Sequence, residues 1–186
     1  MNRAIDPYAP VLVTRDCDAV LIPAGTPILI GAGTEVYITQ ALGGSVTVNV
    51  NGNLARVDGK DLDALGMEPQ EGLVAEARDD GTVDEDLVWM QLRTCYDPEI
   101  PINIVDLGLV YECNISVLPD GAGNRVDVVM TLTAPGCGMG EFLVQDVRQK
   151  LLQVPNVNEV SVELTFDPPW NQELMSEAAR LQTGMY

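Results

Sequence analysis

Apolar and polar residues alternate strictly at residues 45–50, the clearest strand signal in the first part of the chain. Val46, Val48 and Val50 take every second position, so we expect them to share one buried face of a sheet. An asparagine-glycine pair follows, and residues 53–57 return as a second run, which is typical of a β-hairpin. Three further short apolar runs, each bounded by glycine or proline, precede this hairpin at residues 20–23, 27–30 and 35–39. The pattern predicts an all-β first part.

The hydrophobic period changes after this β-rich part. A short helix is predicted over residues 61–65, with Asp61 as its N-cap and Gly66 as its end. Residues 76–86 are rich in acidic side chains around a glycine, and such a run is usually a solvated linker. Its last three residues are all acidic and suit the first turn of a helix that we expect to run to about residue 95.

The second part of the chain alternates between helix and strand patterns. We expect strands at residues 109–117, 125–133 and 157–166, and helices at residues 84–95, 143–154 and 171–181. The first two strands form a hairpin, and a crossover returns the third to the same sheet. This α-β-β-α-β-α order predicts an α+β domain with a small mixed sheet. The expected limits are a β-rich N-terminal domain at 1–75, an acidic linker at 76–86 and an α+β domain at 87–186.

Charge and composition narrow the function classes. The 186 residues carry 28 acidic and 10 basic side chains, a formal charge of -18, which disfavours nucleic acid and anionic membranes as partners. A cationic partner surface or a metal ion fits this charge better. The chain has no histidine, which excludes Ser-His and Cys-His catalytic pairs and His-ligated zinc. We find no apolar leader or membrane-spanning run, so we expect a cytoplasmic, reduced protein.

The four cysteines are Cys17, Cys95, Cys113 and Cys137, and the smallest spacing, from Cys95 to Cys113, is 18 residues. No C-x-x-C or ferredoxin-like spacing occurs, so a self-contained tetrathiolate cluster is not expected. The first three are most simply read as core or surface thiols. Cys113 in particular takes an alternating position in an expected strand.

Cys137 differs because it lies in a glycine-rich turn between an expected strand and an expected helix, within residues 131–140. Gly136, Gly138 and Gly140 leave the backbone free of side chains around the thiol. A helix N-terminus favours the thiolate, which is the nucleophile and the metal-binding form. The alternative is a turn whose cysteine packs as a small apolar residue.

Hairpin pairing would bring two acidic segments to the same end of the sheet as Cys137. Asp97, Glu99 and Asp106 would then tune the thiol, bind a hard cation or simply cap turns, and the last role is the commonest for such residues beside proline and glycine. Nearby carboxylates would raise the pKa of Cys137 and oppose the effect of the helix terminus.

Three stretches together, residues 96–111, 131–140 and 166–170, resemble the small domain shared by the SufT proteins of bacterial iron-sulfur cluster assembly, the PaaD component of phenylacetyl-CoA oxygenation and the eukaryotic cytosolic iron-sulfur targeting factors. The preceding β-rich part is similar to the N-terminal extension of the SufT branch. The resemblance covers nearly the whole chain.

The resemblance implies a non-enzymatic accessory factor that acts between iron-sulfur assembly proteins and apo-target proteins. It makes Cys137 the reactive cysteine and a transient cluster ligand or docking thiol. The supporting motif residues are Asp97, Pro98, Glu99, Asp106, Gly108, Thr133, Pro135, Gly136 and Gly138. One motif thiol cannot hold a cluster alone, so direct binding would need a bridging homodimer, a partner's ligands or glutathione.

Two other function classes stay open at this point. One is a pure protein-protein adaptor in which Cys137 is incidental, and the other is a thiol-dependent enzyme, although no base or resolving cysteine lies within local reach. Trp170, after two prolines, has two readings as well: an anchor for a partner or a lid over the core.

Overall fold

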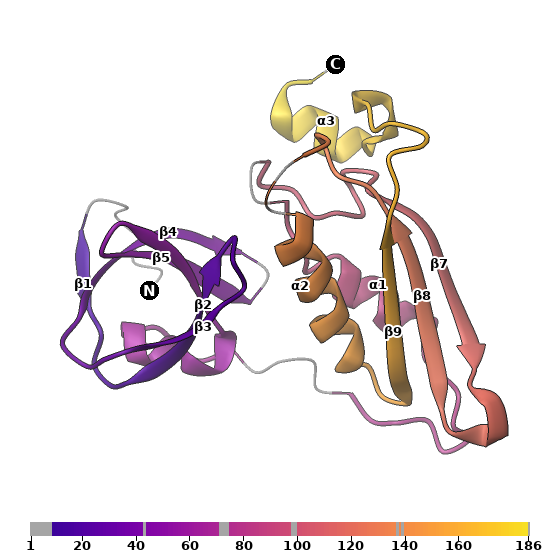
Figure 1. The fold of residues 1–186 in the computed structure, drawn as a ribbon, viewed down its shortest axis with the longest axis horizontal. Coiled ribbons are helices and arrows are strands. Elements are labelled where there is room, and N and C mark those ends of the chain that lie inside the picture. The colour runs from indigo at the N-terminus through magenta and orange to yellow at the C-terminus, as the bar shows by residue number, and fades with distance from the viewer. Residues whose placement is uncertain are drawn as a thin grey trace. The chain divides into compact units, whose positions relative to one another are not determined.

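The computed structural model describes residues 9–42, 44–70, 75–97, 100–136, 138 and 140–185, the side chain of residue 42 excepted. The chain divides into two compact units, Met1–Gly72 and Leu73–Tyr186, which follow one another along the colour ramp of Figure 1. Each unit has a hydrophobic core of its own. No helix in the described ranges is long and apolar enough to cross a membrane.

The first unit is built on one antiparallel sheet, whose described strands run in the spatial order β1-β4-β5-β6-β2-β3. The strands are β1 (Pro10–Leu12), β2 (Cys17–Ile22), β3 (Pro27–Ile30), β4 (Glu35–Leu42), β5 (Ser45–Val50) and β6 (Asn53–Val57). Val46, Val48 and Val50 are all buried, as their alternation predicted. The hairpin is confirmed too, because β5 and β6 pair around Asn51 and Gly52, both with positive φ.

The short helix of this unit is a 3₁₀ helix, η1 (Gly59–Leu65), and it begins earlier than expected. Its N-cap is Asp58, whose side chain accepts a hydrogen bond from the Gly59 N-H at 2.8 Å. The prediction that Asp61 is the cap was wrong because the helix begins two residues before it, and the Asp61 carboxylate pairs with Arg15 at 3.0 Å. Gly66 ends the helix in the left-handed conformation, as predicted.

The second unit contains α1 (Glu85–Leu92), β7 (Val110–Val117), β8 (Asn124–Met130), α2 (Gly140–Leu152), β9 (Val157–Leu164) and α3 (Glu177–Thr183), with 3₁₀ turns η2 (Pro119–Gly121) and η3 (Gln172–Leu174). Strand β8 is central, since β7 pairs with it antiparallel and β9 pairs with it parallel. The predicted α+β class with a small mixed sheet is confirmed.

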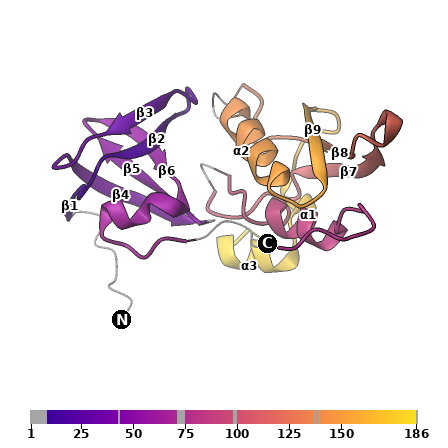
Figure 2. The ribbon, with the colours of Figure 1, turned by 90° about the horizontal axis from the view of Figure 1, so that it is seen from below.

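One face of this sheet carries the core. Figures 1 and 2 both place α1 and α2 on the same side of it. Leu143, Val147 and Leu151 of α2 are fully buried, as are Val126 and alternate residues after it in β8. The opposite face has no helix over it among the described residues, and its side chains are exposed or half-buried.

Two helix limits differ from the sequence prediction because tertiary partners set them. Helix α1 ends at Leu92, since Tyr96 enters an antiparallel bridge with Asn103 and so must be extended. The closing helix is broken into η3 and α3, because Met175 between them is extended and its side chain is buried. Ser176 caps α3 by accepting a hydrogen bond from the Ala179 N-H at 3.2 Å.

Candidate functional site

The glycine-rich loop, residues 131–140, is held at both ends. At its start, the Thr131 N-H donates to the Leu109 carbonyl at 2.8 Å, which ties the end of β8 to the start of β7. At its end, Gly140 is the first residue of α2 and is buried. A Cβ at Gly140 would lie 2.6 Å from Cδ1 of Leu132, so the two ends of the loop are in contact. Cys137 and Met139 lie outside the described residues.

The described part of this loop is open to solvent. Pro135, Gly136 and Gly138 are exposed, and Thr133 is half-buried. Gly136 has a φ of 76°, and no atom lies within 4 Å of a Cβ built on Gly136 or on Gly138. The backbone on both sides of Cys137 is therefore uncovered, and the accessibility of the thiol itself stays a prediction.

Thr131 is a residue that sequence reasoning placed in the loop motif without giving it a role. Its side chain is fully buried, and its hydroxyl oxygen has no hydrogen-bond partner among the described residues. Leaving a buried hydroxyl unpaired costs about 1–3 kcal/mol. In sequence Thr131 looks like an ordinary strand residue, so only the structure reveals this unpaired group at the base of the cysteine loop.

Asp97 acts as a turn former in the segment that leads from α1 to β7. It is buried, its carboxylate accepts a hydrogen bond from the Ile100 N-H at 2.9 Å, and its own N-H donates to the Ile102 carbonyl at 3.1 Å. Pro98 and Glu99 lie outside the described residues. Of the three roles considered for Asp97, the described contacts fit turn capping.

Asp106 is likewise held within its own loop. The Asn103 side-chain amide donates to the Asp106 carboxylate at 2.6 Å, and the Asn103 amide oxygen accepts from the N-H groups of Val105 and Asp106. Sequence reasoning missed Asn103, although an asparagine three residues before an aspartate is a recognisable turn signal. These bonds hold the Asp106 carboxylate within its own loop.

The C-terminal segment contacts this loop through hydrogen bonds and close backbone packing. The Ser176 N-H donates to the Asp106 carbonyl at 2.8 Å, and the Trp170 indole N-H donates to the Leu107 carbonyl at 2.7 Å. Gly108, with a φ of 75°, faces the Leu174 backbone so closely that a Cβ there would overlap the Leu174 carbonyl. Trp170 is half-buried against the core, which fits the lid reading.

The three cysteines that the structure describes are packed into the two cores. Cys17 and Cys95 are buried, and the Cys95 thiol donates to the Gln91 carbonyl at 3.7 Å. Cys113 is half-buried, and burial, with a smaller contribution from Glu85, raises the pKa of its thiol to about 11. The raised pKa values of Cys17 and Cys113 keep these two thiols protonated at neutral pH, and a protonated thiol is a poor metal ligand.

The described residues hold no group of three or more His, Cys, Asp or Glu side chains placed to bind a metal ion. A complete metal site inside the described part of one chain is therefore absent. The structure does bring the start of β7 and the base of the cysteine loop to one end of the sheet, through Leu109 and Thr131. Closeness of Asp97 or Asp106 to Cys137 stays a prediction.

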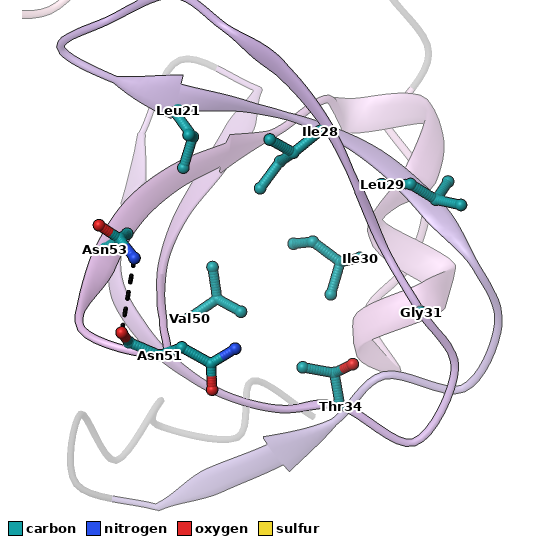
Figure 3. A pocket seen from close by; sticks show the side chains of 9 residues that line it. All are labelled: Leu21, Ile28, Leu29, Ile30, Gly31, Thr34, Val50, Asn51 and Asn53. Carbon is teal, nitrogen blue, oxygen red and sulfur yellow. Dashed lines mark hydrogen bonds between the residues drawn. The ribbon is translucent and has the colours of Figure 1, made fainter.

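The first unit has a small apolar hollow of about 290 Å³, shown in Figure 3. Leu21, Ile28, Ile30 and Val50 point into it, while Leu29 points away. Its rim is polar but carries no titratable or nucleophilic side chain among the described residues. This hollow lacks the groups for thiol or metal chemistry, so the candidate site stays in the second unit.

The chain shows clear similarity to known proteins. A family described as iron-sulfur cluster assembly protein matches residues 85–164. The chain is 50% identical over 101 residues to an Fe-S protein maturation auxiliary factor of Porphyromonas gingivalis, covering 54% of this chain and 90% of that protein. It is 38% identical over 89 residues to the factor SufT of Staphylococcus aureus, covering 48% of this chain and 96% of that protein.

A larger protein shares the same region. Over 89 residues the chain is 32% identical to an iron-sulfur cluster carrier protein of Synechocystis, covering 48% of this chain but 24% of the carrier. The proteins that match over most of their own length are therefore small, and the carrier contains the matching region as one part.

Proposed function

Because the chain belongs to the family of iron-sulfur cluster assembly proteins, we propose that it is an accessory factor in maturing iron-sulfur proteins and that its cargo cluster is held in part by Cys137. The resemblance seen in the sequence motifs is thereby confirmed at the level of the family. The family match carries the proposal, since residues 85–164 contain Cys137 and all nine supporting motif residues from Asp97 to Gly138.

Elimination among the cysteines supports Cys137 as the ligand. The other three thiols are buried or half-buried, and burial raises the pKa of both Cys17 and Cys113. A cluster ligand must be a thiolate that a partner can reach. Cys137 is therefore the cysteine that we propose as the ligand from this chain. It lies three residues before the first residue of α2.

The surroundings of Cys137 suit a ligand that takes up and releases its cargo. Gly136 and Gly138 leave room for the cluster and for a second protein. Fe-S clusters are usually held by four thiolates, so the remaining ligands come from a second copy, a partner or glutathione. An incomplete ligand set favours transfer over storage, because a partner with a full set binds the cluster more tightly.

The relatives' names agree with a role other than catalysis. They are maturation auxiliary factors and a cluster carrier. The chain has no histidine to serve as a general base beside Cys137. Its partners in this proposal are iron-sulfur assembly proteins on one side and apo-target proteins on the other.

Anaerobic cluster reconstitution tests the ligand assignment. We expect the wild-type chain and Cys113→Ser to gain iron, sulfide and visible cluster absorption, and Cys137→Ser to lose nearly all of it. A stoichiometry of half a cluster per chain would identify a bridged dimer. Equal iron content and absorption in wild type and Cys137→Ser would contradict Cys137 as a ligand.

A further inference from the structure

A groove of about 520 Å³ lies on the second unit, and its lining comes from the start of β7, the ends of β8 and β9 and the segments that follow β9. Its apolar lining includes Val110, Tyr111, Val129 and Leu174. Leu174 is 40% exposed and adds apolar surface to this lining. The groove therefore joins apolar surface to the uncovered face of the sheet.

The walls of the groove are fixed by contacts already present. The Tyr111 hydroxyl donates to the Pro168 carbonyl at 2.7 Å, which ties the start of β7 to the segment after β9. Gly108 lets the Leu174 backbone approach the opposite wall. A groove held in this way loses little entropy when it receives a ligand.

Charge is unevenly distributed along this open face. At the groove, Glu112 and Glu163 flank Val129 in one row across the three strands. Asp167 adds a third carboxylate, and no lysine or arginine is among the described residues that line the groove.

The far end of the same face differs because a cation lies beside its carboxylates. There Arg125 pairs with Asp127 at 2.7 Å and with Glu159 at 3.9 Å. Arg125 is thus available to neutralise carboxylates at the far end, whereas no lysine or arginine is among the described residues that line the groove.

We propose that this groove docks a partner protein through an extended segment in which lysine or arginine side chains alternate with apolar ones. The cationic side chains meet Glu112, Glu163 and Asp167, and the apolar ones cover Val129 and Leu174. A divalent metal ion is not the occupant, because the described carboxylates form no group placed to bind one. Complementary charge speeds association and selects the partner.

This inference deepens the proposed function and rests on it for the class of partner. The groove lies at the end of the sheet where the Leu109 and Thr131 backbones are bonded and the cysteine loop begins. A segment docked there would bring an assembly protein or apo-target beside the loop. The site itself does not use Cys137, so it can be tested separately.

The test is a titration of the full chain, labelled with nitrogen-15, with an acetylated hexapeptide of alternating lysine and leucine. We expect amide shifts at Glu112, Val129, Glu163 and Thr165. The double variant Glu112→Gln/Glu163→Gln should bind about fivefold more weakly, since each exposed ion pair is worth roughly 0.5 kcal/mol. A hexapeptide of glutamate and leucine should not bind.

The matched control is Glu76→Gln/Asp79→Asn, which removes two exposed charges from the acidic run at residues 76–86. Its affinity for the peptide should stay within twofold of wild type. Equal weakening by the two double variants would overturn the proposal, because the attraction would then follow net charge alone. Absence of peptide shifts, or saturable shifts of the same amides with calcium chloride alone, would overturn it too.

Cys137→Ser separates this proposal from the function on which it rests. The variant should bind the peptide like wild type even where it fails to hold a cluster. Peptide binding with no cluster in any variant would leave the groove in place and contradict the cluster role. Cluster binding without peptide binding would support the cluster role and contradict the docking groove.

Discussion

Gly108 is the position where one missing side chain has the clearest structural consequence. Its positive φ and its contact with the Leu174 backbone each require glycine. Gly81 has a similar φ of 76° but open space around it. Substitution of each glycine by alanine therefore separates two losses of unfolding free energy. Gly81 reports the cost of the backbone conformation alone, and Gly108 adds the cost of steric overlap.

We expect Gly81→Ala to lower the free energy of unfolding of the second unit by about 1 kcal/mol. Gly108→Ala should cost about 1–3 kcal/mol more, because the added methyl group also displaces the Leu174 backbone. Urea unfolding followed by tryptophan fluorescence measures this, since both tryptophans, Trp89 and Trp170, lie in the second unit. Equal losses of unfolding free energy in the two variants would show that the Leu174 backbone moves aside without an energetic penalty.

Thiol reactivity distinguishes the cysteines one by one. Burial raises the pKa of the Cys113 thiol to about 11, so its thiolate fraction and its alkylation rate should rise with pH until about that value. Cys17 and Cys95 are buried and should react only on unfolding. We therefore expect iodoacetamide at pH 8 to label Cys137 first, as read by mass spectrometry of tryptic peptides. Labelling of Cys113 ahead of Cys137 would argue against an accessible motif thiol.

At the scale of elements, the C-terminal segment is a structural part of the site. Trp170 and Ser176 bond to the loop that carries Asp106 and Leu107. Trp170→Phe removes the bond to the Leu107 carbonyl and should cost about 1–2 kcal/mol for the group left unpaired, besides the lost volume.

The control for this change is Trp89→Phe, a partly buried tryptophan of the same core. It loses a similar volume but keeps the bond between Trp170 and Leu107, so we expect a smaller loss of stability. Far-UV circular dichroism during urea unfolding compares the two. Equal losses would mean that the indole hydrogen bond adds nothing.

Elements defined by local pattern were predictable from sequence. The alternation at Val46 to Val50 gave β5, and the spacing of Leu143, Val147 and Leu151 gave the buried face of α2. Limits that depend on distant partners were not predictable. The 3₁₀ helix begins at Gly59 with Asp58 as its cap, so Asp61 lies inside it and pairs with Arg15. The closing helix breaks where the Ser176 N-H donates to the Asp106 carbonyl.

The site was predictable as a set of motifs rather than as a set of contacts. The pairing that brings Leu109 to Thr131 followed from the hairpin alone. Turn capping by Asp97 was among the roles considered from sequence, and Asn103 carried a turn signal that was missed. The buried hydroxyl of Thr131, which has no partner among the described residues, needed coordinates because it depends on where neighbouring groups point.

At the scale of the whole molecule, the family match falls entirely within the second unit, at residues 85–164. The first unit adds a β-rich body with its own core. The domain limits expected from sequence, 1–75, 76–86 and 87–186, stay a prediction. The charge of -18 favours cationic partner surfaces over nucleic acid and matches the carboxylates of the groove.

The central claim is that the chain matures iron-sulfur proteins through Cys137. The most direct measurement is the specific activity of an iron-sulfur enzyme in cells that lack this protein, complemented with wild type, Cys137→Ser or Cys113→Ser at equal expression. We expect wild type and Cys113→Ser to restore activity and Cys137→Ser to leave it at the level of uncomplemented cells. Full restoration by Cys137→Ser, or no loss of activity without the protein, would contradict the account.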